Sequence, residues 1–132
     1  MKRSMVLLVL FVIGVGFVSA NTLTIRVENA DVGKGLLMIG LANDEESFSG
    51  TFFRRQKMEV TDKETIVIFE DLPKGQYAVS VYQDRNGNEK CDSTIFAIPT
   101  EKYGFSNSIR LPSFKRSSFA LDGEMTITIR IR

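Results

Sequence analysis

Oxygen-bearing side chains alternate through residues 84–92, which read Asp-Arg-Asn-Gly-Asn-Glu-Lys-Cys-Asp. A hard cation such as Ca²⁺ takes about six to eight oxygen ligands, and a loop supplies them by turning every second side chain inward. The spacing therefore predicts a metal site, with Ca²⁺ as its candidate cofactor. The candidate ligands are the side chains of Asp84, Asn86, Asn88 and Asp92 and the backbone carbonyl of Lys90.

Two positions of this loop depart from a full EF-hand pattern. Glu89 stands where the sharp turn prefers glycine, and Ile95 stands where a bidentate glutamate closes the ligand shell. Any affinity for Ca²⁺ is therefore expected in the weak extracellular range, with a Kd of about 10⁻⁴–10⁻³ M. Glu101, in the next segment, is a candidate for the missing ligand. The alternative is a turn without metal, because Asn86-Gly87 is itself a strong turn signal.

Period-two alternation of apolar and polar residues dominates the chain after residue 20 and predicts strands. Residues 36–42 are continuously apolar and are expected to form a strand buried on both faces. Asp122-Gly123 lies between two alternating runs and predicts a tight β-hairpin. About seven short strands, with turn signals at roughly every tenth residue, predict an all-β fold, an antiparallel β-sandwich of the Ig-like kind. The expected strands cover 22–27, 36–42, 65–69, 76–82, 94–98, 117–121 and 125–131.

The first twenty residues have the three-part pattern of a secretory signal peptide, with a basic start, an apolar run over 5–17 and small residues up to Ala20. Cleavage after Ala20 is expected, which leaves residues 21–132 as a single β-sandwich domain. The apolar run is shorter than the ~20 residues that span a bilayer, so no stable membrane insertion is expected after cleavage. These features predict an exported protein, periplasmic or extracellular.

Composition argues against several classes of function. Among 132 residues, 17 are basic and 16 are acidic, and this balance argues against a nucleic-acid partner, which requires a basic surface. Histidine is absent, so histidine-dependent nucleophilic systems and most catalytic zinc sites are excluded. Cys91 is the only cysteine, so no internal disulfide can form, and we expect it to pack as a small hydrophobic residue.

Several segments resemble one bacterial family. They are Phe-Glu-Asp-Leu-Pro-Lys-Gly-Gln-Tyr-Ala-Val over 69–79, the loop 84–92, Ile-Pro-Thr-Glu-Lys-Tyr-Gly-Phe-Ser-Asn over 98–107, and Pro-Ser-Phe over 112–114. The chain is similar to a domain of unknown function (number 2141), an exported family that is similar to transthyretin-like (prealbumin-like) β-sandwiches. The resemblance covers roughly residues 36–132 and implies that fold, but it implies no established activity. Glu89 replaces a glycine common in the family, which makes metal binding less secure here.

Residues 99–113 form a long connection, and long connections often carry function. Its candidate binding residues are Glu101, Tyr103, Phe105 and Asn107. The alternative is that Tyr103 and Phe105 plug the open end of the sandwich, since large aromatic side chains near a small core are usually buried. Because the resemblance includes both this connection and the loop 84–92, we expect the two to form one surface.

These features predict a non-enzymatic binding or accessory module whose partner is a protein, a glycan or an envelope component. The alternative is a carboxylate-based hydrolase acting on an envelope or glycan substrate, with Asp84, Asp92 and Glu101 as acid and base. That activity would require these carboxylates to converge in a cleft, ~5–10 Å apart.

Overall fold

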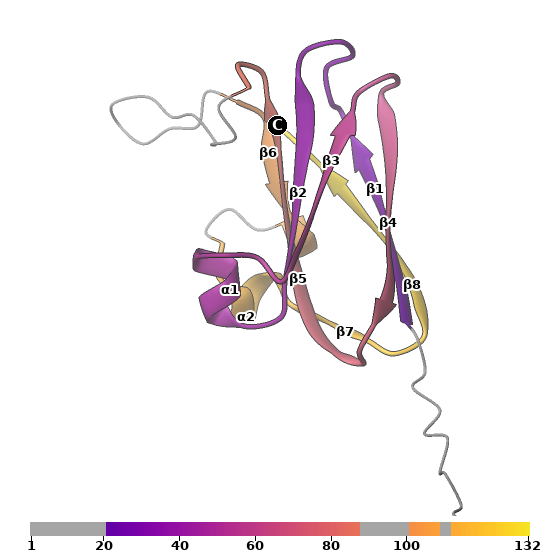
Figure 1. Cartoon of the computed structure of the whole chain (residues 1–132), viewed down its shortest axis with the longest axis vertical. Helices are drawn as coiled ribbons and strands as arrows, with labels where there is room; N and C mark the ends of the chain where they lie inside the picture. Colours follow the sequence, from indigo (N-terminus) through magenta and orange to yellow (C-terminus); the bar gives the residue numbers. More distant parts are fainter. Residues whose placement is uncertain (1–20, 88–100, 109–111) are drawn as a thin grey trace, which may run out of the picture.

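The computed structural model describes residues 21–87, 101–108 and 112–132. In these ranges the chain forms mainly strands, arranged as two facing sheets (Figure 1). The all-β sandwich predicted from alternation is confirmed, and the described ranges contain eight strands where about seven were expected. The predicted signal peptide over 1–20, the predicted strand over 94–98 and Cys91 lie outside the described residues.

The first sheet has three strands in the order β4-β1-β8. They are β1 (Asn21–Glu28), β4 (Glu64–Leu72) and β8 (Glu124–Arg130). β1 pairs antiparallel with β4 but parallel with β8, in a register that places Leu23 beside Met125. The sheet is therefore mixed, whereas the sequence predicted antiparallel pairing throughout.

The second sheet has five strands in the order β3-β2-β5-β6, and β7 also pairs with β5. They are β2 (Leu36–Ala42), β3 (Arg54–Glu59), β5 (Gly75–Asp84), β6 (Tyr103–Phe105) and β7 (Phe119–Leu121). Strand β2 was expected to be buried on both faces. This holds for residues 39–42, whereas Leu36 is exposed and Met38 is half-buried. Gly40 allows close cover of the strand, because a Cβ there would lie 2.6 Å from the ring of Phe52.

Short helices lie beside the second sheet (Figure 1). They are α1 (Glu45–Ser49), the 3₁₀ turn η1 (Ser106–Ser108) and α2 (Phe114–Ser117). Helix α1 begins at a capping box, in which Asp44 Oδ1 accepts from the Ser47 N–H at 2.7 Å. The alternation of the sequence predicted no helix, because an element of about one turn is too short to show an apolar stripe.

The predicted hairpin at Asp122-Gly123 is wrong. Strand β7 pairs with β5 in the second sheet and β8 pairs with β1 in the first, so the chain crosses between the sheets at these residues. Asn21 holds the crossing, because its buried side chain accepts from the Gly123 N–H (2.7 Å) and donates to Leu72 O (2.9 Å). Gly123 has the left-handed backbone, φ +92°, that the turn signal predicts. The signal was therefore correct for the turn and wrong for the pairing.

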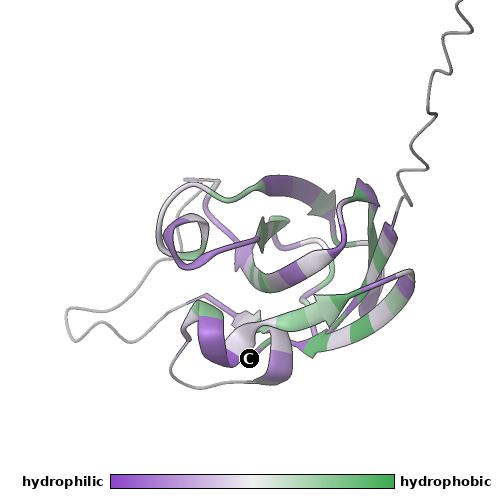
Figure 2. Cartoon of the chain, turned by 90° about the horizontal axis from the view of Figure 1, so that it is seen from below, coloured by the Kyte–Doolittle hydropathy of each residue, from purple (hydrophilic) through white to green (hydrophobic). Residues whose placement is uncertain are grey.

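Alternating inward positions of the strands form the core. Figure 2 shows hydrophobic and hydrophilic residues alternating along the strands. In β1 the inward residues Leu23, Ile25 and Val27 are fully buried. On β4 the outward residues Ile66 and Ile68 are 43% and 46% exposed, so the outer face of this strand is partly apolar.

Two sets of contacts connect the sheets at their edges. Tyr103 and Arg132 exchange backbone hydrogen bonds of 3.1 Å, which joins the start of β6 to the chain that follows β8. On the other side, Gln56 Nε2 of β3 donates to Ile68 O of β4 (2.6 Å), and Arg54 Nη2 donates to Asp71 O (3.1 Å). These side chains occupy carbonyl groups of an edge strand that another chain could otherwise pair with.

Candidate functional site

Three segments meet at one end of the sandwich, which we call the polar end: residues 29–35, 83–87 and 101–102. Gln83 N donates to Lys102 O (2.8 Å), so the chain leaves β5 and returns toward β6 at neighbouring points. The turn between β1 and β2 approaches β5 so closely that a Cβ at Gly35, φ +85°, would lie 1.9 Å from Asp84 O. Only glycine fits this contact.

Gln83 is the buried centre of the polar end. Alternation along β5 turns it inward, on the same face as Tyr77 and Val79, and it is fully buried. Its Nε2 donates to Asp31 O (2.7 Å) and Lys34 O (3.0 Å), and its Oε1 accepts from the Asp31 N–H (2.9 Å). A buried amide that binds three backbone groups holds the turn between β1 and β2 in one conformation.

The carboxylate of Asp31 joins the other two segments to this turn. It accepts from Lys102 Nζ (2.9 Å) and forms an ion pair with the guanidinium of Arg85. Lys102 Nζ also donates to Asn29 O (2.9 Å). The hydrogen bond from Lys102, together with the charges of Lys102, Arg85 and Lys34, holds the pKa of Asp31 below its usual range against the opposing effect of burial. Asp31 is therefore an anion at neutral pH.

Two of the predicted cation ligands lie at the polar end and are buried. Asp84 is 3% exposed, and its Oδ1 accepts from the Gly87 N–H (3.0 Å). Glu101 is 5% exposed, and its Oε2 accepts from the Arg85 N–H (2.6 Å). The structure thus brings Glu101 onto the first turn of the loop that begins at Asp84, although sixteen residues separate Arg85 from Glu101.

Of the other predicted ligands, one lies within the described residues and three do not. Asn86 is exposed at the same turn. Asn88, Lys90 and Asp92 lie outside the described residues. Among residues 21–87, 101–108 and 112–132, no three Asp, Glu, His or Cys side chains gather at a point that suits a metal ion. The cation site therefore stays a prediction.

The predicted binding residues after Glu101 extend away from the polar end along β6 and η1. The rings of Tyr103 and Phe105 meet edge to face, with their centroids 5.7 Å apart. The ring of Phe105 also packs against that of Phe48 in α1, with centroids 6.0 Å apart. Asn107, with φ +63°, donates from Nδ2 to Arg116 O (3.1 Å) and to a second carbonyl nearby (2.9 Å). These side chains connect β6 to the short helices, and their role in ligand binding stays a prediction.

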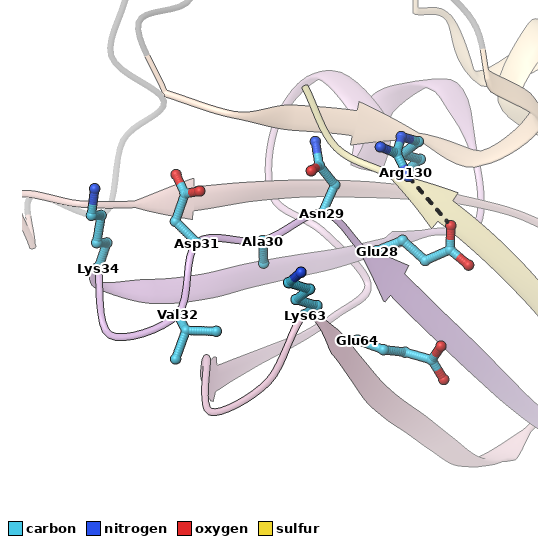
Figure 3. Close-up of a pocket in the computed structure, with 9 residues that line it drawn as sticks. All are labelled: Glu28, Asn29, Ala30, Asp31, Val32, Lys34, Lys63, Glu64 and Arg130. Carbon is cyan, nitrogen blue, oxygen red and sulfur yellow. Dashed lines mark ion pairs between the residues drawn. The ribbon is translucent and has the colours of Figure 1, made fainter.

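A hollow of about 570 Å³ lies beside the turn between β1 and β2 (Figure 3). Its charged lining comes from the carboxylates of Glu28, Asp31 and Glu64 and from the cations of Lys34, Lys63 and Arg130. No local pattern in the sequence indicates this hollow, because its residues come from three places in the chain. Gln83 does carry a local signal that was not used, because a polar residue at an inward position of an alternating strand predicts a buried hydrogen-bonded centre.

No helix in the described part of the chain is long and apolar enough to cross a membrane.

The fold and the polar end together define an all-β domain built on a mixed sandwich. The family model for uncharacterized proteins conserved in bacteria (DUF2141) matches residues 25–128, and the chain belongs to this family. The resemblance seen in the sequence is thereby confirmed at the level of the family. No curated protein and no solved structure matches the chain significantly, so the likeness to transthyretin-like sandwiches stays a prediction.

Proposed function

We propose that this protein is an exported, non-enzymatic binding module whose loop 84–92, together with Glu101, holds a Ca²⁺ ion. One observation carries the proposal: the buried carboxylate of Glu101 docks on the first turn of the loop, at the Arg85 N–H. The sequence suggested Glu101 as the missing ligand, and only folding could bring it there.

The proposed ligand set combines charge with backbone geometry. Asp84 and Glu101 each use one carboxylate oxygen to accept a backbone N–H, at Gly87 and Arg85 respectively. We propose that the carboxylates of both residues also bind the cation. Ca²⁺ prefers carboxylate, amide and backbone carbonyl oxygens, which are the groups proposed here. Because the carboxylates are few and the loop pattern is incomplete, we expect weak binding, with a Kd of about 10⁻⁴–10⁻³ M.

The side chain of Arg85 does not oppose a cation from within the loop. Its guanidinium pairs with Asp31 of the neighbouring turn, and Lys102 pairs with the same carboxylate. Two cations that flank the proposed ligands are thus directed toward an anion outside the loop. This arrangement reduces the repulsion between these two side chains and a bound cation.

Export and an extracytoplasmic partner complete the proposal. Export is supported by the signal-peptide pattern of residues 1–20. The partner that we propose is a protein, a glycan or an envelope component, recognised outside the inner membrane. Weak Ca²⁺ affinity fits such a location, because extracellular modules work in the millimolar range.

A carboxylate hydrolase has less support. It requires the carboxylates of Asp84, Asp92 and Glu101 to converge in a cleft. Asp84 and Glu101 do not line the described hollow, and each carboxylate accepts a backbone N–H, from Gly87 and Arg85 respectively. Asp92 lies outside the described residues.

Thermal unfolding of the purified protein with Ca²⁺, with Mg²⁺ and with chelator tests the metal site. Binding to the native state stabilises it by about 1.4 kcal/mol when free Ca²⁺ is roughly tenfold above Kd, so the melting temperature should rise. Asp84→Asn and Glu101→Gln keep an oxygen for the Gly87 and Arg85 N–H groups but remove a charge. Both variants should fold in chelator and lose most of the shift.

Glu70→Gln, an exposed change on β4, is the matched control and should keep the full shift. No rise in melting temperature at about 10 mM Ca²⁺, tenfold above the weak end of the expected range, would refute the metal site. Mass spectrometry of the same preparation tests export, because the mature chain should begin at Asn21.

A further inference from the structure

We infer that the hollow between the β1–β2 turn and β8 binds an anionic group, a carboxylate or a phosphate, of a small molecule. The hollow measures about 570 Å³, which lies within the ordinary range for small-molecule sites. It is separate from the proposed Ca²⁺ ligands, because neither Asp84 nor Glu101 lines it.

The charges of the lining are not balanced once their partners are counted. Two of its three carboxylates are neutralised by cations from outside the hollow: Glu64 pairs with Arg26 (2.8 Å), and Asp31 pairs with Lys102 and Arg85. Glu28 is the third, and its contact with Arg130 is long, at 4.0 Å. The hollow therefore carries a surplus of positive charge, although the whole chain is almost neutral.

Lys63 and Lys34 are the cations available to a ligand. In the described part of the chain, neither ammonium group has an ion pair or a hydrogen bond. Figure 3 shows Lys63 standing between the side of the hollow formed by Glu28 and the turn that carries Lys34. Arg130 can join them, because its weak contact with Glu28 is easily exchanged for a ligand oxygen.

The wall that carries these cations is held in place before any ligand arrives. Gln83 fixes the backbone at Asp31 and Lys34. Asn29 adopts φ +70°, its Nδ2 donates to Ile131 O (2.8 Å), and its N–H donates to Lys63 O (3.2 Å). A preorganised wall lowers the entropy cost of binding.

The lining also has an apolar part that would contact the body of the ligand. Ala30 is 5% exposed and Val32 is 52% exposed, and both line the hollow. The site thus combines a small apolar surface with cations that orient one anionic group, as small-molecule sites commonly do.

Amide chemical-shift titration of the purified protein with inorganic phosphate, and separately with acetate, tests the inference. Ionic strength is held constant with NaCl, because exposed charges respond to screening alone. We expect saturable shifts confined to residues 29–34 and 63–64, with a Kd near the millimolar range. Stronger binding of phosphate would assign a phosphate ligand, and stronger binding of acetate would assign a carboxylate ligand.

Lys63→Met and Lys34→Met should each weaken this binding roughly three- to tenfold, about the net contribution of one typical hydrogen bond. Lys115→Met removes the same charge from exposed helix α2 and should change nothing. Shifts that fail to saturate with both anions, or that persist unchanged in Lys63→Met and Lys34→Met, would overturn the inference. The amide spectrum of each variant shows at once whether it is folded.

Discussion

The polar end and the helical side of the sandwich are held by different kinds of contact. By the helical side we mean α1, η1 and α2 with the part of β5 and β6 that they cover. At the polar end, Gln83 and Asp31 make directional bonds to segments about fifty residues away. On the helical side, the rings of Phe48, Phe105 and Tyr103 pack against one another.

Two serines show how the helical side tolerates an imperfect polar contact. Ser106 Oγ accepts from the Val79 N–H (2.9 Å) and donates to Ser117 O (2.5 Å). The hydroxyl of Ser117 is fully buried and, within the described residues, has no hydrogen-bond partner. An orphaned hydroxyl is unfavourable, whereas the buried amide at the polar end binds three groups. The comparison indicates that precise geometry is maintained at the polar end, where we place both proposed sites.

Among the changes that test this comparison, Gln83→Leu should have the largest effect on the free energy of unfolding. The change keeps a side chain of similar size but leaves the Asp31 N–H and the carbonyls of Asp31 and Lys34 without their partner. Each unsatisfied group costs about 1–3 kcal/mol, so the free energy of unfolding should fall by roughly 3 kcal/mol or more. Urea unfolding of the wild type and the variant measures this loss of free energy.

Gln76→Leu is the matched control, because Gln76 lies exposed on the same strand. It should change the free energy of unfolding by less than about 0.5 kcal/mol. Equal effects of the two changes would contradict the view that the amide of Gln83 holds the polar end.

Ser106→Ala and Ser117→Ala should have opposite effects on the helical side. The first leaves the Val79 N–H and Ser117 O unpaired and should destabilise the protein by about 2 kcal/mol. The second removes a buried hydroxyl that has no partner and should leave stability unchanged or raise it by up to about 1 kcal/mol. Thermal unfolding of both variants measures the difference, and a clear loss of stability in Ser117→Ala would show that its hydroxyl is bonded.

The smallest effect is expected for Asp31→Asn, whose difference in stability from the wild type should depend on pH. Folding lowers the pKa of Asp31 below its value of 3.8 in a free chain. The stabilisation that results is fully present above pH 3.8 and is lost as the pH falls through the lower pKa of the folded state. The wild type should therefore be more stable than Asp31→Asn at neutral pH, and the gap should narrow in acid.

Urea unfolding from pH 7 down to about pH 3 measures this gap. Glu70→Gln, which removes an exposed carboxylate from β4, serves as the control and should show a nearly constant difference. A gap between the wild type and Asp31→Asn that stays constant with pH would mean that Lys102 and Arg85 do not favour the ionised form.

The candidate site was predictable only in part. Asp84 and Glu101 were recognisable from residue type and spacing, and both lie at the polar end. Asp31 carried no local signal, because its importance depends on Lys102 and Arg85, which lie far away in the chain. The candidate binding residues extend from the polar end to the helical side, which local spacing could not indicate; they are Glu101, Tyr103, Phe105 and Asn107.

Local patterns in the chain predicted six of the eight described strands, their inward faces and the turn residues, but they did not predict β3 or β6. Alternation placed Leu23, Ile25 and Val27 in the core, and Asp122-Gly123 marked a turn. These properties follow from the backbone geometry of a few neighbouring residues. Partners were decided by the tertiary structure: β8 pairs parallel with β1, and β7 pairs with β5. An alternating strand specifies which face is buried, but several strands can pair with it, and the packing of the whole core selects among them.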